Sequence, residues 1–120
     1  MTSSIIVLVV EDEPLIRMEV VDELSDRGFT VFEAAGSREA IELLWRHPEI
    51  QILFTDIDMP GGMDGLMLAA AVRDRWPPIK IIVTSGNQSV DLDDIPTESR
   101  FFSKPHRPDA VAAAMREMVG

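Results

Sequence analysis

Several side chains that could do chemistry lie at the end of a short apolar run or directly after one. These are Glu11, Asp12, Asp56, Thr84 and Lys104. Carboxylates that lie close together repel one another and resist joint ionisation unless they share a cation. Ligands that are all oxygen favour a hard ion, and a site with few carboxylates and open water positions suits Mg²⁺ better than Ca²⁺. These residue types therefore predict a magnesium site, provided that the fold brings them together.

A carboxylate beside such an ion is also suited to phosphate chemistry. The Asp56 carboxylate could attack a phosphoryl group and form an acyl phosphate if the negative charge on the equatorial oxygens is neutralised. Mg²⁺, the Lys104 ammonium and the Thr84 hydroxyl would supply a metal ion, a positive charge and a hydrogen bond for that purpose. The prediction is a phosphoacceptor at Asp56.

The apolar runs that precede these side chains predict the strands of a sheet. Runs rich in β-branched residues are typical of parallel strands that are covered on both faces. The predicted strands are residues 5–10, 29–34, 52–56, 80–83 and 101–103. Helices are expected to begin at Pro14, after Ser37 as N-cap, at Gly65 and at Pro108. Residues 87–99 are rich in aspartate and poor in apolar residues, which predicts a short or frayed helix at best.

The alternation of strands and helices predicts a single α/β domain over residues 1–120. Strands joined through helices run parallel with right-handed crossovers, so helices cover both faces of the sheet. In such a sheet the carboxyl ends of the strands lie at one edge, which is where ligands bind. The polar residues that follow the strands are expected to meet at that edge.

Composition excludes several classes of protein. The chain has 120 residues, of which 46% are hydrophobic, which suits one compact domain. A formal net charge of -10 opposes direct binding to nucleic acid or to anionic membranes. There is no cysteine, which excludes disulfides, thiolate catalysis and cysteine-based zinc sites. The run Ile5–Val10 is too short to span a membrane, so a cytoplasmic protein is expected.

Taken in order, these motifs resemble the receiver domain of two-component response regulators, over essentially the full length of the chain. The matching motifs are Glu11-Asp12, the run from Phe54 through Asp56 to Pro60, Met63-Asp64-Gly65, Thr84, and Phe101 three residues before Lys104-Pro105. The resemblance implies a flavodoxin-like, doubly wound sheet of five parallel strands in the order 2-1-3-4-5, the order known for a chemotaxis regulator of this family.

The resemblance also implies how the site works. A histidine kinase or phosphotransfer protein would donate a phosphoryl group to Asp56. Mg²⁺ would be held by Asp12, by Asp56 and by the main-chain carbonyl of Asp58, with Glu11 acting through a metal-bound water. Such a domain catalyses its own phosphorylation and dephosphorylation but is not a turnover enzyme. A stand-alone receiver is expected here.

A conformational switch is implied as well. Lys104 would pair with the phosphoryl group and precede a cis peptide bond to Pro105. Thr84 would move toward the phosphoryl group, and Phe101 would turn inward into the vacated space. Residues 87–99, the strand before Lys104 and the last helix would then change their contacts with a downstream protein. The same face is a possible homodimer interface.

Some alternatives stay open at this point. Glu11 and Asp12 could simply cap the following helix, and Phe101 could be static packing. Asp56-Ile57-Asp58 also satisfies the Asp-x-Asp motif of haloacid-dehalogenase-type magnesium-dependent phosphatases. A flavodoxin is disfavoured because acids occupy the first turn, where a flavin phosphate needs donors. The sequence departs from the receiver pattern in the additional residue at Gly61-Gly62 and in the short segment 87–99.

Overall fold

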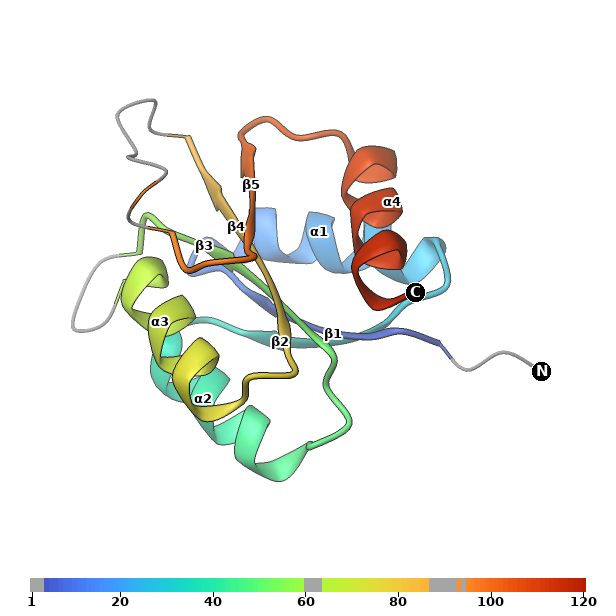
Figure 1. Cartoon of the computed structure of the whole chain (residues 1–120). Helices are drawn as coiled ribbons and strands as arrows, with labels where there is room; N and C mark the ends of the chain where they lie inside the picture. Colours follow the sequence, from blue (N-terminus) through green and yellow to red (C-terminus); the bar gives the residue numbers. More distant parts are fainter. Residues whose placement is uncertain (1–3, 60–63, 87–92, 94) are drawn as a thin grey trace.

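The fold is a parallel β-sheet with helices on both faces (Figure 1). The computed structural model describes residues 4–59, 64–86, 93 and 95–120. The five strands lie in the order β2-β1-β3-β4-β5, and every neighbouring pair is parallel. They are β1 (Ile6–Val10), β2 (Thr30–Ala34), β3 (Ile52–Asp56), β4 (Lys80–Ser85) and β5 (Arg100–Ser103). The strand order implied by the resemblance is confirmed.

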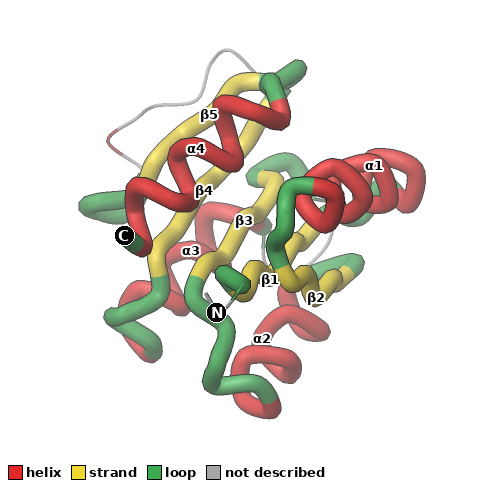
Figure 2. The backbone as a smooth tube through the Cα atoms, turned by 90° about the vertical axis from the view of Figure 1, so that its right-hand side faces the viewer, coloured by secondary structure: helices red, strands yellow, loops and turns green. Residues whose placement is uncertain are grey.

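The described helices form two layers, one on each side of the sheet. They are α1 (Pro14–Asp26), α2 (Ser37–Arg46), α3 (Gly65–Arg75) and α4 (Pro108–Val119). Helices α1 and α4 lie side by side on one face, and α2 and α3 cover the other (Figures 1 and 2). This arrangement is the doubly wound α/β fold that the alternation of strands and helices predicts.

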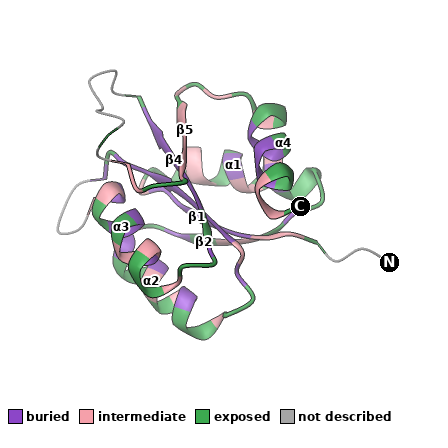
Figure 3. Ribbon diagram, in the orientation of Figure 1, coloured by how far each residue is buried: buried purple, intermediate pink, exposed green. Residues whose placement is uncertain are grey.

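The alternation of side chains along each strand divides the core into two halves (Figure 3). In β1, Val7 and Val9 pack toward α1 and α4 with Val20 and Met115. Leu8 and Val10 belong to the opposite cluster, which includes residues of α2 and α3. β3 is buried along its whole length because both of its faces are covered. Its carboxyl end is therefore held rigidly.

One helix start differs from the sequence prediction. Ser37 is not the N-cap of α2; the helix begins at Ser37, and Gly36 occupies the N-cap position without a side-chain hydrogen bond. The Glu39 carboxylate instead accepts the Ala35 N–H at 2.8 Å, which satisfies a donor just outside the helix. The predicted end of α1 is confirmed: Gly28 has φ +92°, a left-handed conformation that glycine adopts without steric cost.

Two predicted features fall outside the described residues. The loop with Gly61-Gly62 lies there, as does most of segment 87–99. Within the described part of the chain, no helix is long and apolar enough to cross a membrane.

Candidate functional site

The residues that the sequence singles out lie at the carboxyl edge of the sheet. Asp56 ends β3, and Thr84 pairs with it in register on β4. Glu11 and Asp12 follow β1, the other neighbour of β3, and Lys104 follows β5. The parallel fold thus gathers residues that are up to 93 positions apart in the sequence, the separation of Glu11 and Lys104.

Three carboxylates form a cluster at this edge. One oxygen from each of Glu11, Asp12 and Asp56 lies within 4.8 Å of the other two. Glu11 and Asp56 are buried, whereas Asp12 is partly exposed. Glu13 is the N-cap residue of α1, and it makes no side-chain cap hydrogen bond. The Glu11 carboxylate accepts the Glu13 N–H at 3.1 Å, so Glu11 contacts the start of the helix in addition to the cluster.

Lys104 bridges two of these carboxylates. Its Nζ donates to Asp56 Oδ2 at 3.0 Å and to Glu11 Oε1 at 3.1 Å. Burial alone would lower the pKa of the Lys104 ammonium, but its hydrogen bonds to Asp56 and Glu11 outweigh that effect and raise the pKa. Lys104 is therefore positively charged at neutral pH.

Neighbouring donors only partly offset the cost of burying the charge of the Glu11 carboxylate. Burial raises its pKa, and the nearby Asp56 charge adds to this; the Glu13 N–H and Lys104 act against it without cancelling it. The pKa of Glu11 rises mainly because of burial, whereas the pKa of Lys104 rises because its ammonium is shared between two buried carboxylates. The cluster therefore has more negative charge than its own lysine can balance.

Asp58 interacts with the phosphoacceptor candidate through its main chain. Its N–H donates to Asp56 Oδ1 at 3.0 Å, so that both carboxylate oxygens of Asp56 accept a hydrogen bond. The Asp58 carboxylate accepts the Ser85 hydroxyl at 2.7 Å. The Asp58 side chain is thus directed to β4 and not to the Asp56 carboxylate.

The loop after β5 fixes the position of Lys104. The Lys104 N–H donates to the Ser85 carbonyl at 2.9 Å, and the Lys104–Pro105 peptide bond is cis. His106 packs edge-on against Phe54, with 5.5 Å between ring centroids. Burial and the Lys104 charge lower the pKa of the His106 imidazole. His106 thus adds no second positive charge at neutral pH.

The two expected switch residues lie on neighbouring strands. Thr84 is buried, and its carbonyl accepts the Ile57 N–H at 2.8 Å. Phe101 pairs with Val83 of β4 and is partly buried against the core cluster on the α3 side of the sheet. A strand pair thus connects Phe101 to the strand that carries Thr84.

The structure shows three contributors to the site that sequence reasoning missed. Arg17 donates to the Glu11 carbonyl at 2.9 Å and pairs with Glu33 at 3.1 Å. Ser85 contacts Asp58, and Gly65 packs directly on the Asp56–Ile57 backbone. For Gly65 a signal existed, since a glycine at a helix start can mark close backbone approach.

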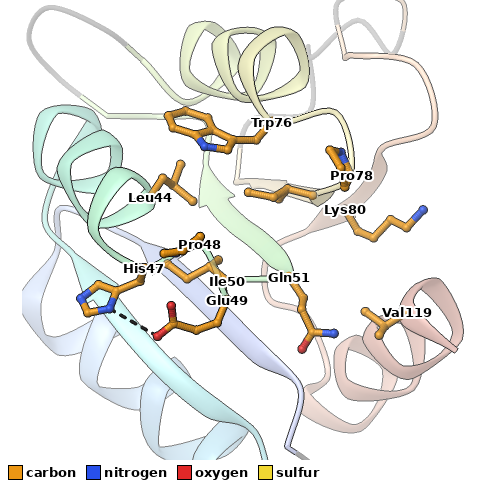
Figure 4. A pocket seen from close by; sticks show the side chains of 11 residues that line it. Leu44, His47, Pro48, Glu49, Ile50, Gln51, Trp76, Pro78, Lys80 and Val119 are labelled. Atoms are coloured by element: carbon orange, nitrogen blue, oxygen red, sulfur yellow. Dashed lines mark ion pairs between the residues drawn. The ribbon is translucent and has the colours of Figure 1, made fainter.

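The pocket drawn in Figure 4 lies at the opposite edge of the sheet. Its volume is about 410 Å³, and its lining includes Gln51 just before β3 and Lys80 at the start of β4. Leu44, Trp76 and Val119 contribute apolar walls, and His47 pairs with Glu49 at 3.4 Å. None of the site residues predicted from the sequence lines this pocket, so the acidic edge is the better candidate site.

The acidic edge suits a hard divalent cation. Its donors are carboxylate oxygens within 4.8 Å of one another, and histidine and cysteine are absent from this described cluster. The Lys104 ammonium pairs with two of the three carboxylates of this cluster, so one positive charge faces three negative ones. The residues present therefore fit Mg²⁺.

Comparisons with known proteins agree with this geometry. Residues 7–116 match the family described as response regulator receiver domain. The chain is 36% identical to part of the sensor kinase CckA of Brucella abortus, a match that covers 99% of this chain and 13% of that kinase. It is 32% identical to the chemotaxis protein CheY of Thermotoga maritima, covering 93% of this chain and 95% of CheY.

A solved structure supports the same conclusion. The crystal structure of the receiver domain from the hybrid histidine kinase CckA superimposes with a TM-score of 0.81 and 28% identity, covering 96% of this chain and 99% of that one. In this chain the acidic cluster and Lys104 lie at one edge of a five-stranded parallel sheet. The chain belongs to the response regulator receiver domain family of two-component systems.

Proposed function

We propose that this receiver domain accepts a phosphoryl group on Asp56 from a phosphohistidine of a histidine kinase or phosphotransfer protein, in the presence of Mg²⁺. The observation that carries the proposal is the convergence of Glu11, Asp12, Asp56 and Lys104 on one edge of the sheet. The direct test is labelling with a small phosphodonor and Mg²⁺, which should add one phosphoryl group per chain, at Asp56.

The reaction can be written from the residues present. An Asp56 carboxylate oxygen attacks the phosphorus, the bond between phosphorus and the donor imidazole nitrogen breaks, and that nitrogen keeps the electron pair. Lys104, 3.0 Å from Asp56 Oδ2, neutralises charge on the phosphoryl oxygens, and the Thr84 hydroxyl donates a hydrogen bond. Asp12, Asp56 and the Asp58 carbonyl would hold Mg²⁺, with Glu11 acting through water, and the bound ion would supply further charge neutralisation.

The phosphatase alternative has no comparable support. The family match covers residues 7–116 and is to receiver domains. In the structure the second carboxylate of the Asp-x-Asp motif, Asp58, accepts a hydrogen bond from Ser85 at 2.7 Å. We therefore propose that the chain transfers a phosphoryl group onto and off itself and is not a turnover enzyme.

The proposed output is a change of shape on the β4–β5 side of the sheet. Phosphorylation would draw Thr84 toward Asp56 and let Phe101 turn inward, altering the surface formed by residues 87–99, β5 and α4. Val83, the residue before Thr84, pairs with Phe101, which supports a link between Thr84 and Phe101. Part of that surface lies outside the described residues, and its use in a homodimer or with a downstream protein stays a prediction.

Mg²⁺ should stabilise the protein in a pH-dependent way. The folded state holds the Glu11 proton more tightly than the unfolded state, for which the reference pKa is 4.5. Stability from this group is present below that pH and is lost as pH rises through the folded pKa. At neutral pH, Mg²⁺ at a hundredfold excess over its Kd should raise the unfolding free energy by about 2.7 kcal/mol.

Thermal unfolding with and without Mg²⁺ checks this prediction. The gain from Mg²⁺ should shrink as the pH approaches 4.5 and Glu11 becomes protonated. In Asp12→Asn the gain should be largely absent at neutral pH. An equal gain in that variant and in the wild type would show that the ion stabilises the chain elsewhere.

The start of α1 offers a surface for the phosphodonor protein. Leu15 is 78% exposed and Met18 is 56% exposed, and their spacing of three residues places them on the same side of the helix. They follow the Glu11-Asp12 loop within the first turns of α1. A partner that presents a phosphohistidine to Asp56 would bury these apolar side chains.

Polar replacements should therefore slow transfer from a protein donor. Leu15→Gln and Met18→Gln should each reduce the rate of transfer from a phosphorylated kinase about fivefold or more, the effect of losing an interface contact worth over 1 kcal/mol. Labelling by acetyl phosphate should not change, since that donor needs no docking surface. Met67→Gln is a matched control, because Met67 on α3 is 53% exposed. Equal slowing with both donors would place the effect in the site itself.

A further inference from the structure

Four residues at the acidic edge form a closed cycle of hydrogen bonds. The Asp58 N–H donates to Asp56 Oδ1 at 3.0 Å, and the Asp58 carboxylate accepts the Ser85 hydroxyl at 2.7 Å. The Ser85 carbonyl accepts the Lys104 N–H at 2.9 Å, and Lys104 Nζ returns to Asp56 Oδ2 at 3.0 Å. Ser85 thus connects the loop after β3 with the loop after β5.

The Ser85 hydroxyl connects a buried residue to an exposed one. Ser85 is 1% exposed at the end of β4, so its position is fixed by the sheet. Asp58, in contrast, is exposed in the loop after β3, between the buried residues Ile57 and Met59. A hydrogen bond from a hydroxyl to a carboxylate is stronger than one between two neutral groups. The rigid residue therefore holds the exposed one.

We propose that Ser85 is a positioning residue that acts through Asp58 and sets the affinity of the acidic edge for Mg²⁺. This inference rests on the proposed function, in which the Asp58 main-chain carbonyl is a metal ligand. The hydrogen bond from Ser85 fixes the Asp58 side chain, and through it the peptide that carries this carbonyl. Residues that orient metal ligands typically change metal affinity tenfold to a hundredfold when they are replaced.

Isothermal titration with Mg²⁺ alone tests the proposal on the unphosphorylated protein. Ser85→Ala should weaken Mg²⁺ binding about tenfold, the lower end of that range, since Asp58 is exposed. Phosphorylation by acetyl phosphate should slow at low Mg²⁺ and return to the wild-type rate at saturating Mg²⁺. Ser103→Ala is a matched control, because Ser103 is the exposed residue that pairs with Ser85 on β5. It should bind Mg²⁺ as the wild type does.

A double-mutant cycle identifies Asp58 as the partner. In Asp58→Asn the amide oxygen can still accept the Ser85 hydroxyl, so adding Ser85→Ala should again weaken binding. In Asp58→Ala the acceptor is gone, and adding Ser85→Ala should change the affinity less than twofold. The two backgrounds separate loss of the hydrogen bond from loss of the Asp58 charge. Circular dichroism of each variant verifies that it is folded.

Two results would overturn the inference. One is a Ser85→Ala protein that binds Mg²⁺ as tightly as the wild type. The other is equal weakening by Ser85→Ala with aspartate and with alanine at position 58. A failure of the proposed function looks different, because then Asp12→Asn would bind Mg²⁺ as well as the wild type does, or neither protein would bind it.

Discussion

Asp56→Asn will reduce phosphorylation of the chain at least a hundredfold, to the detection limit of intact-protein mass spectrometry with acetyl phosphate and Mg²⁺. The amide is a poor nucleophile, and the replacement leaves the size of the side chain nearly unchanged. The Asp56 carboxylate is the group toward which both the Lys104 ammonium and the Asp58 N–H point. These donors lie beside the carboxylate, where the oxygens of a bound phosphoryl group would bring further negative charge.

Asp58→Asn provides the comparison that separates two mechanisms. If the chain acts as a receiver, Asp58 contributes its main-chain carbonyl, and the variant should still be labelled at Asp56. In a haloacid-dehalogenase-type phosphatase the second aspartate is essential, and turnover of a phosphomonoester would stop in this variant. Equal labelling of the wild type and Asp56→Asn would exclude Asp56 as the acceptor.

Gly65→Ala will destabilise the fold and impair the site together. A Cβ at position 65 would overlap the Asp56 carbonyl oxygen and would lie 2.7 Å from the Ile57 Cα. The obstructing atoms are backbone, so α3 or the end of β3 must move. Overpacking of this kind typically costs 1–3 kcal/mol, and the upper part of that range, about 3 kcal/mol, is expected here. Urea unfolding and the rate of labelling by acetyl phosphate measure the two effects.

Gly36→Ala is the matched control for this prediction. A Cβ at position 36 meets nothing within 4 Å, and the residue is the N-cap of α2, away from Asp56. Its loss of stability should stay below about 1 kcal/mol, the usual cost of a poorer N-cap. An unchanged unfolding midpoint in Gly65→Ala would contradict the close approach of α3 to the end of β3.

The ends of several elements could be predicted because their signals are local. β3 begins at Ile52 and ends at Asp56 as expected, since a continuous apolar run stops at a carboxylate. α3 ends at Arg75, shortly before Pro77-Pro78, which cannot continue a helix. The position of Asp56 in the site follows from these local signals and from the rule that parallel strands end at one edge.

The start of α2 could not be predicted as well. Three small or polar residues, Ala35, Gly36 and Ser37, lie around its start, and serine is the best N-cap among them. In the structure Gly36 takes that position, and the Glu39 carboxylate reaches back to the Ala35 N–H. This hydrogen bond fixes the residue before the N-cap, a position that the capping rule for serine does not cover.

Contacts between different secondary-structure elements could not be predicted, for a different reason. Ser85 and Asp58 are 27 residues apart, and Arg17 and Glu33 are 16 apart. The first contact depends on how the loop after β3 meets the end of β4, and the second on how α1 packs beside β2. A pattern in one segment does not record either. The family resemblance pointed to the residues that are predicted to bind and react, but not to those that contact them.

The most direct test of the account locates the phosphoryl group in the wild-type chain. After incubation with acetyl phosphate and Mg²⁺, borohydride reduction converts an aspartyl phosphate into homoserine, and peptide mass spectrometry identifies its position. If Asp56 is the phosphoacceptor, homoserine should replace Asp56 and no other aspartate, and none should form when Mg²⁺ is removed. Homoserine at Asp12 or Asp58 instead, or none in the presence of Mg²⁺, would contradict it.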